Sequence, residues 1–175
     1  METVLKKAKH IRLVIFDVDG ILTSGKILYG PKGAEYKAFH AMDGLGIKLL
    51  QQAQIHVAII TAKQSESVST RMQDLKVQFV YQGQSNKVPA YEELKLKLNF
   101  EDQNIAYAGD DLPDIPLLRR AGLAITVPHA PSIVKTQVDW ITTANGGSGA
   151  VREICDTLLQ AQGLYQSYVD HYLQM

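Results

Sequence analysis

The chain has few of the features that mark several protein classes. It contains one cysteine, Cys155, which excludes an internal disulfide framework and a cysteine-based zinc site and is typical of a reducing compartment. Its 18 basic and 18 acidic residues give a formal net charge of zero, so no overall field attracts nucleic acid or an anionic membrane. No apolar run approaches the roughly 18 residues of a membrane span. We therefore expect no nucleic acid and no membrane among its partners.

The composition that remains is that of one folded domain. Of the 175 residues, 46% are hydrophobic and 21% are charged, whereas disordered chains are poorer in apolar residues. A chain of this length buries a sizeable core, and we expect a single domain over residues 1–175. The basic segment Met1–His10 leads into a short strand pattern rather than the apolar stretch of a signal peptide. We therefore expect a cytoplasmic protein.

Short apolar runs alternate with helical patterns along the chain. The runs that predict strands are Ile11–Phe16, Ile55–Ile60, Gln78–Tyr81, Ile105–Ala108 and Leu123–Val127. The stretches that predict helices are Gly44–Ala53, Glu66–Leu75, Lys87–Leu98, Pro113–Ala121 and Gly149–Gln162. Parallel strands need crossover connections, and helices supply them. The pattern therefore predicts a doubly wound α/β fold, Rossmann-like, with a mostly parallel sheet and helices on both faces.

Residues 26–39 interrupt this alternation. Two short strand patterns flank the turn sequence Gly-Pro-Lys-Gly, which predicts an inserted β-hairpin. The hairpin follows the first strand, at the carboxyl edge where such sheets bind ligands. This position favours a lid or a subunit contact over a purely decorative surface hairpin. At the other end of the chain, the tail over residues 164–175 is apolar enough to pack on a partner but too short to fold alone.

Two acidic clusters each follow an apolar strand. Asp17 and Asp19 are two positions apart, so their side chains point to the same side at the strand end. Asp110, Asp111 and Asp114 follow a second apolar strand and open a helix. Asp110 or Asp111 alone is explained equally well as a helix N-cap. Two clusters at one sheet edge favour an oxygen-lined site for Mg²⁺ instead.

Two further polar residues lie at predicted strand ends. Thr61 closes the strand Ile55–Ile60, where its hydroxyl and nearby backbone amides can bind a phosphate oxygen. Lys87 begins a helix, where the helix dipole disfavours a cation. Most lysines are simply solvated on the surface, but this unfavourable position and the other polar strand ends favour a role facing an anion.

The order of these residues resembles the four motifs of the haloacid dehalogenase superfamily of phosphatases. The matching motifs are Asp17-Val18-Asp19-Gly20, Thr61, Lys87 and Gly109-Asp110-Asp111-Leu112-Pro113-Asp114. Longer stretches resemble the small capless branch typified by phosphatases of 3-deoxy-D-manno-octulosonate 8-phosphate. These stretches are Ala38–Gly44, Tyr81–Lys87 and Gly146–Glu153. The longer motifs are far more specific than Asp-x-Asp, and the resemblance extends over nearly the whole chain.

The resemblance implies a role in the chemistry for three of these acids: Asp17, Asp19 and Asp110. Asp17 would be the nucleophile that forms an aspartyl-phosphate. Asp19 would be the general acid that protonates the leaving alcohol and later activates water. Mg²⁺ would be held by the carboxylates of Asp17 and Asp110 and by the backbone carbonyl of Asp19.

The same resemblance implies supporting roles for four other residues. Thr61 and Lys87 would hold oxygens of the transferring phosphoryl group. Asp111 and Asp114 would orient Lys87 and the waters on the metal. These roles would complete a site that concentrates both signs of charge in an otherwise neutral chain.

The resemblance also implies a set of contacts with a small anionic sugar phosphate. Besides Asp19 and Lys87, they are His40, Ala41, Met42, Asp43, Gly44, Lys48, Lys63 and Arg71. The family usually has Asn in place of His40 and often Arg in place of Met42, Lys48 and Lys63. Lysine attracts a carboxylate but lacks the two-pronged geometry of arginine, and methionine does neither.

The function implied is hydrolysis of 3-deoxy-D-manno-octulosonate 8-phosphate in lipopolysaccharide biosynthesis by a homotetramer in which the hairpins pack together. Because of the departures just described, a phosphatase of a sialic-type sugar 9-phosphate or another small ester stays open. A receiver-type signalling module also places acids, Thr and Lys at such a sheet edge. It has no need, however, of an acid two residues after its phosphoacceptor, as Asp19 is here. A non-catalytic scaffold is disfavoured because all motif positions are filled.

Overall fold

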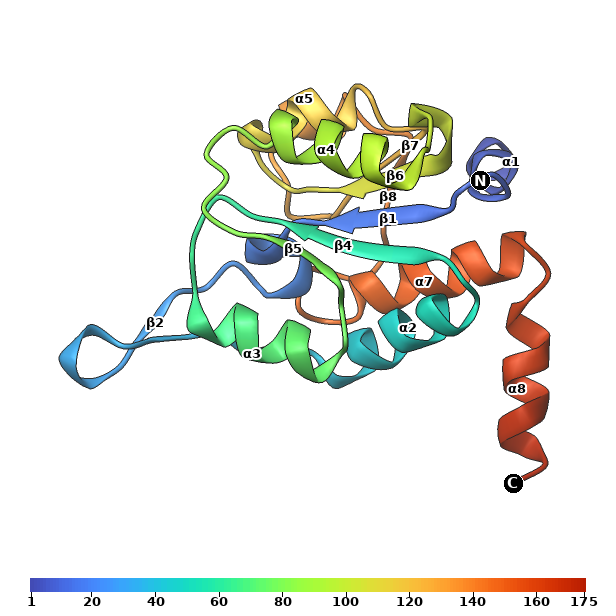
Figure 1. Cartoon of the computed structure of the whole chain (residues 1–175), viewed down its shortest axis with the longest axis horizontal. Helices are drawn as coiled ribbons and strands as arrows, with labels where there is room; N and C mark the ends of the chain where they lie inside the picture. The colour runs from blue at the N-terminus through green and yellow to red at the C-terminus, as the bar shows by residue number, and fades with distance from the viewer.

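A six-stranded parallel sheet forms the centre of the molecule in a computed structural model that describes residues 1–175 (Figure 1). The strand order is β5-β4-β1-β6-β7-β8, so the first strand lies near the middle. The bounds are β1 Leu13–Phe16, β4 His56–Ile60, β5 Phe79–Tyr81, β6 Ile105–Ala108, β7 Leu123–Thr126 and β8 Trp140–Ile141. Every pairing is parallel, which confirms the predicted fold class.

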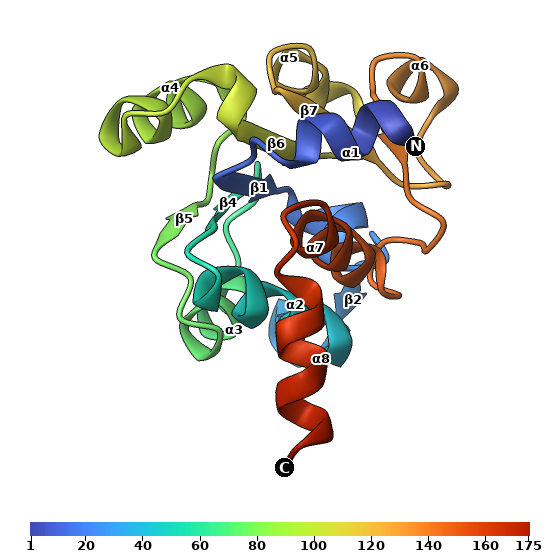
Figure 2. The same ribbon diagram turned by 90° about the vertical axis from the view of Figure 1, so that its right-hand side faces the viewer.

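Helices cover both faces of this sheet. Helices α4 and α5 lie on one face and α2, α3 and α7 on the other (Figures 1 and 2). The α-helices are α1 Glu2–Ala8, α2 Ala41–Gln52, α3 Glu66–Asp74, α4 Val88–Leu98, α5 Ile115–Leu118, α6 Ser132–Lys135, α7 Ala150–Ala161 and α8 Tyr165–Leu173. Short turns of tighter or wider helix occur at η1 Val18–Leu22, η2 Pro31–Gly33, η3 Asp102–Asn104 and η4 Leu112–Asp114. No helix is both apolar enough and long enough to cross a lipid bilayer.

Burial explains why the strands read as continuous apolar runs. All four residues of β1 are fully buried, as are those of β6. Strands of a parallel sheet are covered on both faces, so alternation between polar and apolar positions is lost. In α7 the buried positions instead recur at helical spacing, because only one side of that helix faces the core.

Several elements differ from the sequence prediction. The segments before the first strand and after Leu164 form helices α1 and α8, and Trp140–Ile141 adds a sixth strand. Helix α1 buries Val4 and Ala8 and packs on α7, so a tertiary contact stabilises a helix too short to form alone. The helix predicted over Pro113–Ala121 is divided into η4 and the short α5. These differences lie at the ends of the chain and in elements of a few residues.

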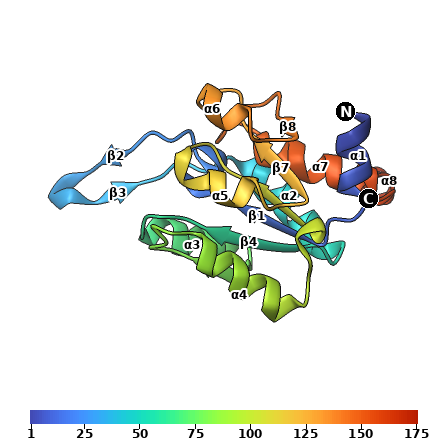
Figure 3. The same ribbon diagram turned by 90° about the horizontal axis from the view of Figure 1, so that it is seen from above.

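Two features project from the body at opposite ends. The hairpin, formed by β2 Leu28–Tyr29 and β3 Glu35–Tyr36, extends from the side where the sheet strands end (Figures 1 and 3). Its position confirms an insertion between the first strand and the first helix of the sheet. Helix α8 leaves the body at the other end and carries the C-terminus (Figure 2). Both features expose large apolar side chains, among them Tyr29 and Leu173.

Candidate active site

Three neighbouring strands bring the predicted polar residues to one sheet edge. Strand β1 pairs with β4 and β6 so that Phe16 lies opposite both Ile59 and Ala108. The residues that follow these positions therefore leave the sheet at the same level. Asp17 follows β1, Thr61 follows β4 and Asp110 lies two residues after β6. Register alone thus places the first and last motifs side by side.

Lys87 links two buried carboxylates at the centre of the site. Its Nζ lies 2.6 Å from Asp17 Oδ1 and 2.6 Å from Asp114 Oδ1. It also lies 3.3 Å from the hydroxyl of Tyr107, and its own side chain is 3% exposed. Burial alone lowers the pKa of a lysine, but here the two carboxylates outweigh burial and raise the pKa of Lys87. The lysine is therefore a fixed cation beside Asp17.

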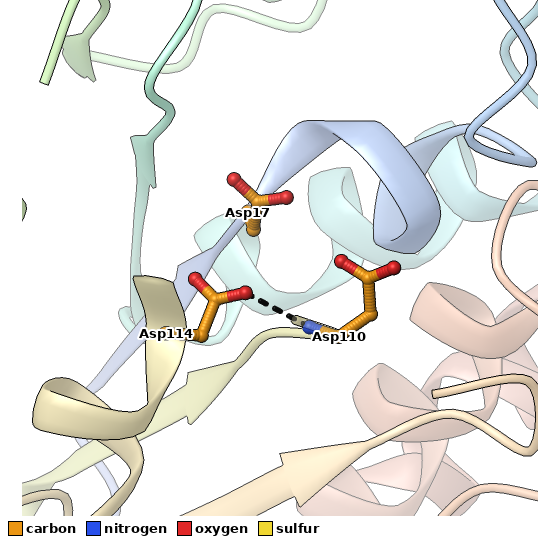
Figure 4. Close-up of side chains that lie close together, drawn as sticks. All are labelled: Asp17, Asp110 and Asp114. Atoms are coloured by element: carbon orange, nitrogen blue, oxygen red, sulfur yellow. Dashed lines mark hydrogen bonds between the residues drawn. The ribbon is translucent and has the colours of Figure 1, made fainter. Parts of the chain in front are cut away.

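Asp114 is the anchor of this arrangement. Its Oδ1 accepts hydrogen bonds from Lys87 and Tyr107, and its Oδ2 accepts from the backbone amides of Asp110 and Asp111 at 3.0 and 3.1 Å (Figure 4). Both carboxylate oxygens are thus fully engaged by the protein. Asp114 holds Lys87 in place and fixes the loop that carries Asp110.

The acidic cluster can accept a divalent cation. Oxygen atoms of Asp17, Asp110 and Asp114 all lie within 4.8 Å of one another (Figure 4). Burial raises the pKa of Asp17 to about 7, with Asp114 adding repulsion and Lys87 opposing both. Burial and the charges of Asp17, Asp114 and Asp111 raise the pKa of Asp110 to about 7. Such crowded carboxylates need a compensating positive charge, and because Asp114 is already fully engaged, Asp17 and Asp110 are the available ligands.

The turn after β1 directs Asp19 towards the same cleft. Gly20 has φ of +95°, a conformation that glycine adopts readily. A Cβ atom at Gly20 would lie 2.0 Å from Asp110 Oδ2, so a larger residue would displace that carboxylate. The turn therefore requires glycine for both its backbone conformation and its close approach to Asp110. Asp19 itself is paired with Lys37, whose Nζ lies 2.5 Å from Asp19 Oδ1.

These side chains line a cleft of about 290 Å³ at the sheet edge. Eight predicted site residues line it: Asp17, Asp19, Thr61, Lys63, Lys87, Asp110, Asp111 and Asp114. The structure therefore brings together every residue for which a part in the chemistry was predicted. The roles themselves stay predictions.

The remaining predicted sugar contacts do not line this cleft in one copy of the chain. They are His40, Ala41, Met42, Asp43, Gly44, Lys48 and Arg71. Asp43 is 2% exposed, and its Oδ1 accepts a hydrogen bond at 2.9 Å from the amide of Arg152 in the first turn of α7. Arg71 lines a groove between the hairpin and α3, and the exposed Lys48 lines a separate hollow. Any contact of these residues with a substrate in the cleft stays a prediction.

Two residues that contact the site, Tyr107 and Lys37, were not predicted from the sequence. Tyr107 is fully buried in β6, where it reads as an ordinary core residue, yet its hydroxyl donates to Asp114. A lone polar tip in an apolar strand is the only sequence signal for it. Lys37 lies in the hairpin segment, and nothing in its spacing indicates that it reaches Asp19.

The chain resembles known phosphatases over almost its whole length. A sequence profile of haloacid dehalogenase-like hydrolases matches residues 50–154. The 3-deoxy-D-manno-octulosonate 8-phosphate phosphatase of Escherichia coli K12 is 46% identical over 160 residues, which are 91% of this chain and 85% of that protein. The corresponding protein of Yersinia pestis is 42% identical over 161 residues, 92% of this chain and 86% of that protein.

Solved structures agree with this relationship. The phosphatase of the same name from Moraxella catarrhalis was solved with a magnesium ion, a phosphate ion and 3-deoxy-D-manno-octulosonate (KDO). It superposes on this chain with a TM-score of 0.96 at 43% identity, and the match covers 98% of this chain and 99% of that protein. A haloacid dehalogenase superfamily hydrolase (subfamily III A, described as putative) from Legionella pneumophila superposes with a TM-score of 0.95 at 44% identity, covering 100% and 96%. This chain belongs to the haloacid dehalogenase-like hydrolases.

Proposed function

We propose that this chain is a Mg²⁺-dependent phosphatase that hydrolyses 3-deoxy-D-manno-octulosonate 8-phosphate in lipopolysaccharide biosynthesis. The observation that carries the proposal is the buried pair of Asp17 and Lys87 in a cleft that Asp19 also lines. The relatives of that name match this chain over most of their own length. Membership in a hydrolase family argues against the receiver-type module and the non-catalytic scaffold.

In the first step, Asp17 acts as the nucleophile. Lys87 donates a hydrogen bond to Oδ1 of Asp17 at 2.6 Å and so holds this carboxylate in place for attack on phosphorus. A bond forms between Asp17 and phosphorus while the bond between phosphorus and the sugar oxygen breaks. Asp19 gives its proton to that departing oxygen, so that the sugar leaves as an alcohol.

In the second step, water releases the phosphate. Asp19, now a carboxylate, takes a proton from a water molecule as the water oxygen attacks phosphorus. The bond from phosphorus to Asp17 breaks, inorganic phosphate leaves and both acids return to their starting states. Lys87 and the hydroxyl and amides near Thr61 hold the phosphoryl oxygens throughout.

Asp17 and Asp110 would hold Mg²⁺ through their carboxylates, together with the backbone carbonyl of Asp19. When bound, the ion offsets the repulsion between an anionic nucleophile and an anionic phosphate. Asp114 supports these ligands, because its Oδ2 accepts hydrogen bonds from the backbone amides of Asp110 and Asp111. Asp111 lines the same cleft, where it would orient waters on the metal.

Removal of the metal should make stability depend on pH. The folded-state pKa values of Asp17 and Asp110, about 7, lie above the value of about 4 for a free aspartate. The metal-free fold therefore holds protons that the unfolded chain has lost, and its stability falls as pH rises from about 4 to about 7. Mg²⁺ replaces those protons, so it should stabilise more at pH 8 than at pH 5. At about 100 times its Kd the gain is about 2.7 kcal/mol, or roughly 5–10 °C in Tm.

Thermal melts in EDTA and in MgCl₂ at pH 5 and pH 8 measure this effect. Asp110→Asn should remove most of the Mg²⁺-dependent shift, because it deletes one ligand and much of the repulsion. Asp74→Asn is the matched control, since Asp74 is an exposed carboxylate of α3 without an ion pair. A shift of the same size at both pH values would contradict the assignment of Asp17 and Asp110 to the metal.

The substrate is the finer part of the proposal. Lys63 lines the cleft and supplies a cation for the carboxylate of the sugar acid. The segment His40–Gly44, Lys48 and Arg71 would contribute in a homotetramer in which a neighbouring subunit covers the cleft. The hairpin supports such an assembly, because it exposes Leu28, Tyr29 and Tyr36 by 52%, 73% and 54%.

Phosphate release from a panel of sugar phosphates tests the substrate. We expect kcat/KM for the 8-phosphate to exceed that for a sialic-type 9-phosphate by at least about 10-fold, the discrimination that a few pocket contacts supply. No phosphate should be released in EDTA. Equally poor turnover of both sugars would overturn the substrate and favour another small ester, while leaving the phosphatase chemistry in place.

A further inference from the structure

A buried lysine of the hairpin segment contacts the proposed acid-base residue. The side chain of Lys37 is only 1% exposed, and its Nζ lies 2.5 Å from Asp19 Oδ1 and 2.9 Å from Glu35 Oε1. A lysine that is removed from water to this extent requires paired carboxylates. The Lys37 ammonium therefore forms a specific ionic contact between the hairpin segment and the cleft. Lys32, by contrast, is exposed at the hairpin turn.

The lysine is held firmly from the hairpin side. Glu35 belongs to β3, and its backbone carbonyl accepts a hydrogen bond from Ser67 Oγ in α3 at 3.3 Å. This bond ties the returning strand of the hairpin to the body of the protein. Lys37 follows two residues later, so its ammonium approaches Asp19 from an anchored segment.

The contact fixes one oxygen of Asp19 and leaves the other available. Oδ1 is the atom bound by Lys37, whereas Oδ2 takes part in no hydrogen bond. Asp19 lies within the irregular turn η1 and is partly exposed, so its side chain has little other restraint. Proton transfer requires the acid to be within hydrogen-bond reach of the leaving oxygen, and a misplacement of about 1 Å costs up to about 10²-fold in rate.

We propose that Lys37 is a positioning residue that sets the orientation of Asp19 for proton transfer, with Glu35 holding Lys37 in turn. The inference rests on the proposed function only in assigning Asp19 the acid-base role. It makes the hairpin part of the catalytic apparatus of its own subunit, through a contact inside one chain. If Lys37 only fastened the hairpin to the body, its replacement would lower kcat/KM for all substrates by the same factor.

Leaving-group chemistry separates these two roles. The alkoxide of glycerol 2-phosphate is a poor leaving group and needs a proton, whereas p-nitrophenolate leaves without one. The ratio kcat/KM reports the steps up to the first cleavage, in which Asp19 is the acid. We expect Lys37→Met to lower kcat/KM for glycerol 2-phosphate by about 10- to 100-fold, within the range of general acid catalysis, and for p-nitrophenyl phosphate by no more than about 3-fold.

Two comparisons sharpen the experiment. Asp19→Asn should show the same substrate dependence, and adding Lys37→Met to it should cause no further selective loss, because both changes remove one function. Lys32→Met is the matched control and should leave kcat/KM unchanged for both substrates. Neither ester is the sugar phosphate, so a wrong natural substrate would not alter the result.

Equal losses for the two esters, or no loss, would overturn the role of Lys37. Should Lys37→Met fail to fold, Lys37→Arg gives the same test, since it keeps the charge but displaces the Asp19 carboxylate. A loss confined to glycerol 2-phosphate again supports the proposal, and an equal loss or none refutes it.

Discussion

Asp17→Asn is expected to lower phosphate release by at least about 10⁴-fold, because loss of an enzyme nucleophile costs up to about 10⁶-fold in known cases. An asparagine has nearly the same shape, but its neutral amide oxygen does not attack phosphorus. The fold should survive, since Lys87 keeps Asp114 as its partner. Steady-state phosphate release and a thermal melt measure the two effects separately.

The control for this substitution is Asp170→Asn, which makes the same chemical change at an exposed site in α8, at the other end of the molecule from the cleft. It should retain wild-type turnover. If Asp17→Asn kept more than a few per cent of the activity while Asp170→Asn behaved normally, another group would have to be the nucleophile.

Lys87→Met is expected to damage both stability and activity. It leaves the buried carboxylates of Asp17 and Asp114 facing each other without the cation that separates them. Removing one member of a buried ion pair costs about 3–5 kcal/mol, which corresponds to a fall in Tm of roughly 6–20 °C for a chain of this size. Phosphate release should fall by about 10²- to 10³-fold, because a fixed charge on the phosphoryl oxygens is lost.

Urea unfolding in EDTA at pH 6 and pH 8 measures the stability effect. The loss should be larger at pH 8, because at pH 6 the paired carboxylates relieve their repulsion by taking up a proton. Lys97→Met is the matched control, since Lys97 is an exposed lysine of α4, the helix that begins directly after Lys87. A Lys87→Met protein as stable as the wild type at pH 8 would show that Lys87 does not compensate these acids.

The residues of the chemistry were predictable because the chain itself places them at strand ends. Asp17 directly follows β1, Thr61 directly follows β4, and Asp110 comes two residues after β6. A parallel sheet aligns such strand ends at one edge. Register therefore converts a one-dimensional pattern into the cluster of Asp17, Thr61 and Asp110. The fold class followed from the same alternation of strands and helices.

The contacts that orient these residues were not predictable from local pattern. Lys37 reaches Asp19 from a hairpin segment, and Tyr107 reaches Asp114 from inside a strand. The direction of such a side chain depends on how distant segments pack together. The spacing of residues along the sequence gives no information about that packing. Helix α1 was missed for the same reason, since its burial against α7 stabilises it.

The central place of β1 in the sheet has a consequence for how the site arises. Asp17 and Asp19 follow β1, and Lys87, which binds Asp17, comes 70 residues later in the chain than Asp17. The flanking strands β4 and β6 each reach β1 only through long crossover connections, and such non-local pairings form slowly because loop closure precedes any stabilising contact. The side chains of the site therefore come together only once β4 and β6 have both paired with β1.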